Sequence, residues 1–130
     1  MHHLFFLCFA LLIPLVFLGG CGSSASDAYH KITAEAGHEM ILKDHITVID
    51  VREPSEYSEG HVPTAKLIPL GTIDESVTEK LPDKKAPVIV YCRSGVRSKK
   101  AANKLVGLGY TDVRDMGGIL DWPYEIEKQR

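Results

Sequence analysis

The chain has 130 residues, of which 15 are Lys or Arg and 17 are Asp or Glu, giving a formal net charge of −2 at pH 7. This length has room for one ordinary domain, which excludes a multidomain enzyme and a protein with many membrane spans. The slightly negative charge excludes a generally basic nucleic-acid binder, and the 25% share of charged residues beside 45% hydrophobic ones excludes a disordered chain.

The first 20 residues differ from the rest, since they contain no Asp, Glu, Lys or Arg and 15 of them are apolar. The apolar run Leu4–Leu18 is shorter than the roughly 20 residues that a membrane-spanning helix needs, and Pro14 interrupts it. These features are typical of the hydrophobic region of a secretory signal peptide.

This apolar run ends in Leu18-Gly19-Gly20-Cys21, which resembles the lipobox of bacterial lipoproteins. The resemblance implies cleavage between Gly20 and Cys21 and attachment of a diacyl lipid to Cys21. One feature departs from the pattern, because no Lys or Arg precedes the apolar run. The alternative is an uncleaved signal anchor in which Cys21 has no role.

These observations predict how the chain is divided. We expect a lipoprotein-type signal peptide at 1–20, a flexible tether of mostly small and polar residues at 21–29, and a folded domain at 30–130. The expected location is the cell envelope, where the lipid anchor would hold the exported protein to the periplasmic or extracytoplasmic face of a membrane.

The first half of the expected domain has clear helix boundaries. Thr33 is suited to cap a helix, Pro54 to occupy the first turn of another, and Gly60 to end it. Asp74 and Glu75 are placed favourably in the first turn of a third helix. The predicted elements are a helix over 34–43, a strand over 46–51, a helix over 54–59, a strand over 66–69 and a helix over 72–81.

The second half contains the most apolar strand of the chain, Pro87–Tyr91. It follows a turn at 82–85 and precedes a helix over 98–108, which Gly109 ends. A short strand over 111–114 is expected next, and Gly117-Gly118 is expected to break the chain before a helical turn near Trp122.

Apolar strands that alternate with helices predict an α/β domain with a central parallel sheet and helices on both faces. Ligands of such domains bind at the carboxyl ends of the strands. The strand that ends at Tyr91 places Cys92 there, followed by a polar loop that leads into the next helix.

Cys92 has neighbours that favour a reactive thiolate. Gly95 allows the loop to turn its backbone N–H groups toward the sulfur, and the start of the following helix adds partial positive charge. The alternative is an inert core thiol, since free cysteines are common in protein cores. The polar residues of the loop argue against that interpretation.

Positive charge is also concentrated in the segment around Cys92. Between Lys84 and Thr111 the chain has seven basic residues and no acidic one. Arg93 and Arg97 lie in the loop itself, whereas Lys99 and Lys100 lie in the first turn of the predicted helix, where cations are mildly unfavourable. A pocket that attracts a small anion would explain this pattern.

Three motifs in this order resemble the rhodanese-like sulfurtransferases, in their single-domain form. The resemblance covers roughly 32–127, and one departure is Thr64, where the family usually has Gly. The motifs are Asp50-Val51-Arg52-Glu53-Pro54-Ser55-Glu56-Tyr57 with Gly60-His61-Val62-Pro63-Thr64-Ala65 and Ile68-Pro69-Leu70, then Val90-Tyr91-Cys92-Arg93-Ser94-Gly95-Val96-Arg97-Ser98, and finally Gly117-Gly118 with Trp122.

The resemblance implies a chemistry for these residues. Cys92 would take a sulfane sulfur from a small anionic donor such as thiosulfate, hold it as a persulfide, and pass it to cyanide or a thiol. Asp50 and Arg52 would brace the site, His61 would be structural, and neither a metal nor an organic cofactor is expected. The substrate-binding loop would consist of Arg93, Ser94, Gly95, Val96 and Arg97.

Three other functions remain open at this stage. A cysteine-dependent phosphatase or arsenate reductase uses a Cys-x₅-Arg loop, whereas here four residues separate Cys92 from Arg97. A non-catalytic binding module of the same fold is the second. The third, a thiol redox protein, is disfavoured because the chain has no Cys-x-x-Cys motif.

Overall fold

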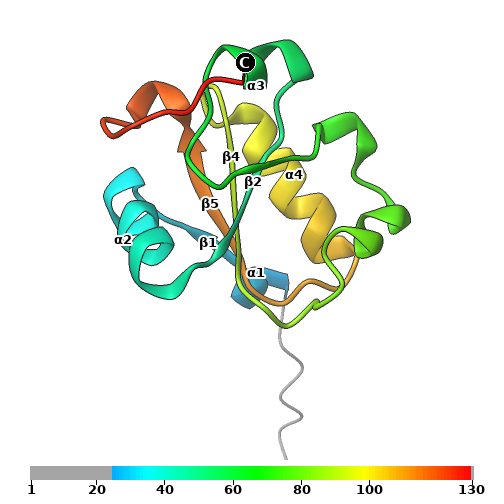
Figure 1. Ribbon diagram of the computed structural model, residues 1–130. Helices are drawn as coiled ribbons and strands as arrows, with labels where there is room; N and C mark the ends of the chain where they lie inside the picture. The colour runs from blue at the N-terminus through cyan, green and yellow to red at the C-terminus, as the bar shows by residue number, and fades with distance from the viewer. Residues whose placement is uncertain (1–24, 130) are drawn as a thin grey trace, which may run out of the picture.

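The computed structural model describes residues 25–129, which form one parallel five-stranded sheet with helices on both faces (Figure 1). The strand order is β1-β5-β4-β2-β3, so that β4 lies at the centre. Every strand pair in the sheet is parallel. The strands are β1 (Tyr29–Lys31), β2 (Thr47–Asp50), β3 (Lys66–Leu67), β4 (Val88–Cys92) and β5 (Val113–Gly118).

A helical segment lies between each pair of consecutive strands, as the predicted alternation requires. Two short 3₁₀ turns, η1 and η2, connect β3 to β4, and a third, η3, follows β5. Among the described residues, no helix is both long and apolar enough to cross a membrane. The helical elements are α1 (Ala25–Ala28), α2 (Ala34–Asp44), α3 (Pro54–Glu59), η1 (Leu70–Thr72), η2 (Glu75–Glu79), α4 (Val96–Gly107) and η3 (Ile119–Asp121).

Side chains of β4 alternate between two cores, as the period of a strand requires. Val88, Val90 and Cys92 face the core that α4 covers, whereas Ile89 and Tyr91 face the core beneath α2 and the C-terminal segment. All five residues of β4 are buried. The central strand is therefore covered on both faces, which confirms the predicted α/β architecture.

The boundaries of α2 and α3 agree with the sequence. The Thr33 side chain accepts a hydrogen bond from the Ala36 N–H at 3.1 Å, which fixes the start of α2. Helix α3 covers 54–59, as predicted, and its first turn is closed by a capping box between Glu53 and Glu56.

The helix predicted over 72–81 is wrong, because the chain there forms η1 and η2 instead. Asp74 interrupts the helix: its side chain accepts hydrogen bonds from the Ser76 N–H and hydroxyl, and its backbone is extended. Such local side-chain bonds compete with α-helical ones. The segment still buries Ile73, Val77 and Leu81 against the core.

Two further differences from the prediction lie near Cys92. Helix α4 starts at Val96 rather than Ser98, with Gly95 in a left-handed conformation at its N-cap. Strand β5 extends through Gly117-Gly118, which therefore do not break the chain. Both differences bring regular structure closer to Cys92.

The sequence did not predict β1, which pairs with the outer edge of β5. Its residues Tyr29–Lys31 have little apolar character, as befits a short edge strand. Residues 25–29, which the sequence assigned to a flexible tether, form α1 and the first position of β1.

Candidate active site

Cys92 is the last residue of the central strand and is fully buried. The Gly95 N–H donates a hydrogen bond to the Cys92 Sγ at 3.0 Å. Gly95 can do so because its φ of 103° lies in the left-handed region that favours glycine. The first turn of α4 follows directly, so a backbone donor and a helix N-terminus both favour negative charge on the sulfur.

The Gly117-Gly118 pair supports this loop from the end of β5. Cys92 pairs with Gly118, and a Cβ at Gly118 would overlap the Arg93 carbonyl group. The Leu120 N–H donates to that same carbonyl at 3.2 Å. Sequence reasoning assigned the glycines to a chain break, whereas their role here is to allow two backbones to approach closely.

A buried carboxylate, Asp115, lies beneath the loop. Its Oδ1 is 2.7 Å from the Ser98 Oγ and accepts a hydrogen bond from the Gly117 N–H at 2.9 Å. Its Oδ2 accepts from the Tyr29 hydroxyl at 2.7 Å. Because the Ser98 Oγ also lies 3.0 Å from the Gly95 carbonyl oxygen, this network reaches the residue that contacts the sulfur.

Tyr29 and Asp115 were not among the predicted site residues. Burial, together with the Asp115 carboxylate, raises the pKa of Tyr29 to about 12, so its hydroxyl remains a donor. A charged residue two positions before Gly117-Gly118 is the signal that could have identified Asp115. Tyr29 offered no such signal, since it lies 86 positions away in the chain.

Arg97, at the end of the loop, has an acidic partner that comes from α3. Its guanidinium forms two hydrogen bonds with the Glu56 carboxylate, at 2.6 and 2.9 Å. The pair lowers the pKa of Glu56 to about 2, chiefly through the Arg97 hydrogen bond. The same bond raises the pKa of Arg97. The segment around Arg97 has no acidic residue in sequence, but the fold brings Glu56 from α3 to pair with it.

The other loop residues are more open to solvent. Arg93, Ser94 and Val96 are exposed, and Gly95 is half-buried. Among the ion pairs of residues 25–129, none involves Arg93. Arg93 is therefore the loop cation that is available to a ligand.

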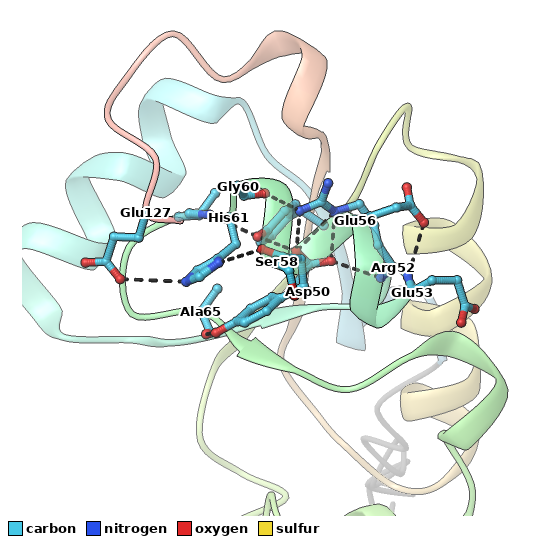
Figure 2. A network of polar contacts seen from close by, with 12 residues as sticks. Asp50, Arg52, Glu53, Glu56, Ser58, Gly60, His61, Ala65 and Glu127 are labelled. Carbon is cyan, nitrogen blue, oxygen red and sulfur yellow. Dashed lines mark hydrogen bonds and ion pairs between the residues drawn. The ribbon is translucent and has the colours of Figure 1, made fainter. Parts of the chain in front are cut away.

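A second buried network lies on the other side of Cys92, and Asp50 is its centre (Figure 2). The Asp50 carboxylate accepts hydrogen bonds from the Arg52 guanidinium, the shortest at 2.7 Å, and from the Tyr91 hydroxyl at 2.7 Å. Arg52 also donates to the Gly60 carbonyl at 2.7 Å. Since Tyr91 precedes Cys92, this network ties the ends of β2, β4 and α3 together.

Tyr91 links that network to the turn after α3. Its hydroxyl accepts a hydrogen bond from the Val62 N–H at 3.0 Å while donating to Asp50. Burial raises the pKa of Tyr91, and the Asp50 charge raises it further. Tyr91 therefore stays neutral and holds the strand end in place.

His61 is buried and fully engaged in local contacts. Its Nδ1 lies 2.9 Å from the Tyr57 carbonyl oxygen, and its ring stacks on that of Tyr57 at 3.7 Å. Its Nε2 lies 3.7 Å from the Glu127 carboxylate, an acidic neighbour that comes from the C-terminal segment rather than from the motif (Figure 2). Two backbone hydrogen bonds at 2.8 Å also join His61 to Glu127. These contacts favour the structural role.

One predicted feature cannot be placed in this site. Cys21 lies outside the described residues. Within residues 25–129, no group of three or more His, Cys, Asp or Glu side chains is arranged to hold a metal ion.

Comparison with known proteins agrees with this geometry. Residues 33–124 match the family model described as Rhodanese-like domain. The chain is 42% identical over 73 residues to the thiosulfate sulfurtransferase PspE of Escherichia coli K12, a match that covers 56% of this chain and 70% of PspE. It is 32% identical over 96 residues to the thiosulfate sulfurtransferase GlpE of Pseudoalteromonas translucida, covering 73% and 90% of the two chains.

Solved structures show the same fold. A rhodanese with anions from E. coli superimposes with a TM-score of 0.60 and 39% identity, covering 63% of this chain and 96% of that one. A rhodanese-like domain protein from Staphylococcus aureus gives a TM-score of 0.65 and 30% identity, with 78% and 99% of the two chains covered.

Proposed function

The chain belongs to the rhodanese-like domain family, and from that premise we propose that it is a thiosulfate:acceptor sulfurtransferase that works through a persulfide on Cys92. The observation that carries the proposal is the position of Cys92 at the end of the central strand, with its sulfur 3.0 Å from the Gly95 N. Relatives named thiosulfate sulfurtransferase support the class of reaction.

The first half-reaction forms the persulfide. The Cys92 thiolate attacks the outer sulfur of thiosulfate, the S–S bond of the donor breaks, and sulfite leaves with the bonding electron pair. Arg93 attracts the anionic donor, and the Gly95 N–H, which already contacts the sulfur, faces the negative charge. Arg97, at the end of the loop, contributes to the site by joining the loop to α3 through its ion pair with Glu56.

The second half-reaction restores the thiolate. Cyanide or a thiolate attacks the outer sulfur of the persulfide, the S–S bond to Cys92 breaks, and thiocyanate or a new persulfide departs. A thiolate already stabilised by the Gly95 N–H and the α4 N-terminus needs no general base. Asp50 and Arg52 act as bracing residues, since their network fixes Tyr91 next to Cys92.

The loop length favours sulfur over phosphate or arsenate chemistry. Only four residues separate Cys92 from Arg97, and Gly95 N–H already points at the sulfur itself. A smaller ring of N–H groups suits a single sulfur atom better than a tetrahedral oxyanion. Hydrolysis of p-nitrophenyl phosphate by the protein at a rate comparable to sulfur transfer would favour the phosphatase alternative.

Thiocyanate production from thiosulfate and cyanide tests the proposal. Wild type is expected to produce thiocyanate. Cys92→Ser is expected to produce none, because its hydroxyl cannot hold the transferred sulfur. Circular dichroism of Cys92→Ser would verify that the fold is intact. Equal thiocyanate production by the two proteins would contradict the assignment.

We also propose that residues 1–20 are a signal peptide and that lipidated Cys21 anchors the domain to a membrane of the cell envelope. The support is the apolar run followed by Leu18-Gly19-Gly20-Cys21. In this arrangement the sulfurtransferase domain works outside the cytoplasm, joined to its anchor by a short segment.

A further inference from the structure

Exposed apolar side chains border the Cys92 loop. Within residues 25–129, four large apolar side chains are well exposed: Leu42 at 63%, Val96 at 63%, Leu120 at 67% and Ile126 at 47%. Val96 directly follows Gly95, whose N–H contacts the sulfur. Leu120 is tied to the loop through its backbone bond to the Arg93 carbonyl. Two of these four side chains therefore flank the reactive group.

Basic side chains complete the same border. Lys99 and Lys100 follow Val96 by three and four positions on α4, so the three side chains are neighbours on one helix face. Both lysines and Arg93 are exposed, and in the described part of the chain none of them forms an ion pair. We call this surface the loop rim; it consists of Arg93, Val96, Lys99, Lys100 and Leu120.

The positive charge of the loop rim is not offset by the carboxylates closest to the loop. Glu56 is paired with Arg97, and Asp115 is buried beneath Ser98. Asp121 is exposed beside Leu120, and the exposed Glu53 is close enough to Arg97 to raise its pKa. Lys99, in the first turn of α4, opposes the helix dipole, so its charge does not stabilise the helix. A charge that does not help the fold suggests a role in recognition.

We propose that the loop rim docks the sulfur acceptor, and that this acceptor is a cysteine of a polypeptide with acidic and apolar side chains beside its thiol. Cyanide or a small free thiol would gain nothing from exposed leucine and valine side chains, whereas a polypeptide would bury them. The acidic side chains would face the three basic groups of the rim. This inference rests on the proposed sulfurtransferase function and specifies its acceptor.

The transfer step balances without any further reagent. The acceptor thiolate attacks the outer sulfur of the Cys92 persulfide, and a new S–S bond forms on the acceptor. The S–S bond to Cys92 breaks, and its electron pair remains on Cys92 as a thiolate. The outer sulfur, which takes a proton from water once the persulfide has formed, carries that proton to the acceptor. Because Cys92 is fully buried, the acceptor thiol must protrude into the loop, which places its flanking residues on the rim.

Two short peptides test the proposal with the full domain. In one peptide the Cys has Glu on one side and Leu on the other. In the second peptide Lys replaces Glu and Ser replaces Leu. For each enzyme, kcat/KM for sulfur transfer to a peptide is divided by kcat/KM for transfer to cyanide. The intrinsic thiol reactivity of each peptide, measured with a small disulfide, is divided out as well. Wild type should prefer the acidic, apolar peptide by about tenfold at low ionic strength, and the preference should fall as salt is added.

Matched variants locate the effect. Leu120→Ser should lower the peptide-to-cyanide ratio several-fold, whereas Leu42→Ser, on a similarly exposed leucine of α2, should leave it unchanged. Lys100→Gln should weaken the preference for the acidic peptide, and Lys104→Gln, at the other end of α4, should not. Equal use of both peptides by wild type, or equal effects of Leu120→Ser and Leu42→Ser, would overturn the proposal. A failure of the cyanide reaction itself would instead show that the sulfurtransferase function is wrong, and the docking proposal would fall with it.

Discussion

Asp115 stands out among single residues because it connects the two supports of the Cys92 loop. Its carboxylate holds both the Ser98 hydroxyl and the Gly117 N–H, and it lies 3.7 Å from the Lys31 amine. Ser98 in turn contacts the Gly95 carbonyl. Replacing this carboxylate therefore affects stability and the geometry around the sulfur together.

We predict that Asp115→Asn lowers the free energy of unfolding by about 2 kcal/mol, the scale of hydrogen bonds to a buried charged group. The amide keeps the shape of the side chain but presents a donor where Tyr29 already donates. Urea denaturation measures the change. The matched control is Asp112→Asn, whose half-exposed ion pair with Arg114 should contribute less than about 1 kcal/mol. Equal losses for the two variants would contradict the role assigned to Asp115.

The Glu56–Arg97 pair predicts a specific dependence of stability on pH. The pKa of Glu56 is about 2 in the folded protein, below its ordinary value of 4.5. The unfolded chain binds a proton at Glu56 at higher pH than the folded protein does. The stabilisation is therefore fully present above about pH 4.5 and is lost as the pH falls toward 2.

Glu56→Gln should accordingly be less stable than wild type at neutral pH, and the difference in melting temperature should narrow between pH 4.5 and 2. Thermal denaturation of both proteins across this range measures it. A difference that stays constant with pH would mean that the charge of Glu56 does not contribute.

At the scale of elements, the end of β5 and the Cys92 loop depend on each other through Gly118. An added Cβ would overlap the Arg93 carbonyl and shift the loop. We predict that Gly118→Ala folds but loses sulfur transfer by roughly 100-fold, a typical consequence of displacing a reacting group by about 1 Å. Gly107→Ala is the control, because nothing lies within 4 Å of its Cβ position in α4.

Gly107→Ala should keep full activity and stabilise the helix by up to about 1 kcal/mol. Thiocyanate production and urea denaturation compare the two glycine variants. Full activity of Gly118→Ala would show that the close approach of β5 is not needed for the site.

Elements fixed by local signals could be predicted from the sequence, and those that depend on distant partners could not. Helices α2 and α3 follow from Thr33, Pro54 and Gly60, whose effects act within one turn. The apolar run of β4 likewise placed Cys92 at a strand end. Strand β1 lacks such a pattern, because its place is set by pairing with β5 far along the chain.

The candidate site divides in the same way. The loop sequence identified Cys92 and its immediate neighbours, since they are consecutive in the chain. The partners Glu56 and Asp115 could not be assigned, because tertiary contacts bring them to Arg97 and Ser98. Asp74, whose side-chain hydrogen bonds replace the predicted helix by η1 and η2, is visible in the sequence. The same residues also show a helical pattern, and the sequence alone does not decide between the two.

At the scale of the whole molecule, the parallel sheet gathers the strand ends that carry the site. The C-terminal segment returns to the same end of the sheet, where Glu127 pairs with His61 (Figure 1). The described N-terminal residues form α1 and β1, and β1 joins the edge of the sheet at β5. An anchor at Cys21 would therefore be attached only a few residues before the ordered domain.

Metabolic labelling with a fatty acid tests the anchor. Wild type should incorporate the label and lack residues 1–20, and two acyl chains on Cys21 would give stable attachment to the membrane. Cys21→Ser should remain unlabelled, because it lacks the thiol that carries the lipid. Mass spectrometry of the mature N-terminus checks the cleavage. Unlabelled wild type with its full N-terminus would favour a plain signal anchor, and the chemistry proposed for Cys92 would be unaffected.

The proposed chemistry requires Cys92 to carry a sulfur atom between two substrates. Intact mass spectrometry of the purified domain after incubation with thiosulfate tests it most directly. Wild type should gain the mass of one sulfur atom, cyanide should remove it, and Cys92→Ser should never gain it. A wild-type mass that does not change with thiosulfate, or an equal gain by Cys92→Ser, would show that Cys92 is not the sulfur carrier.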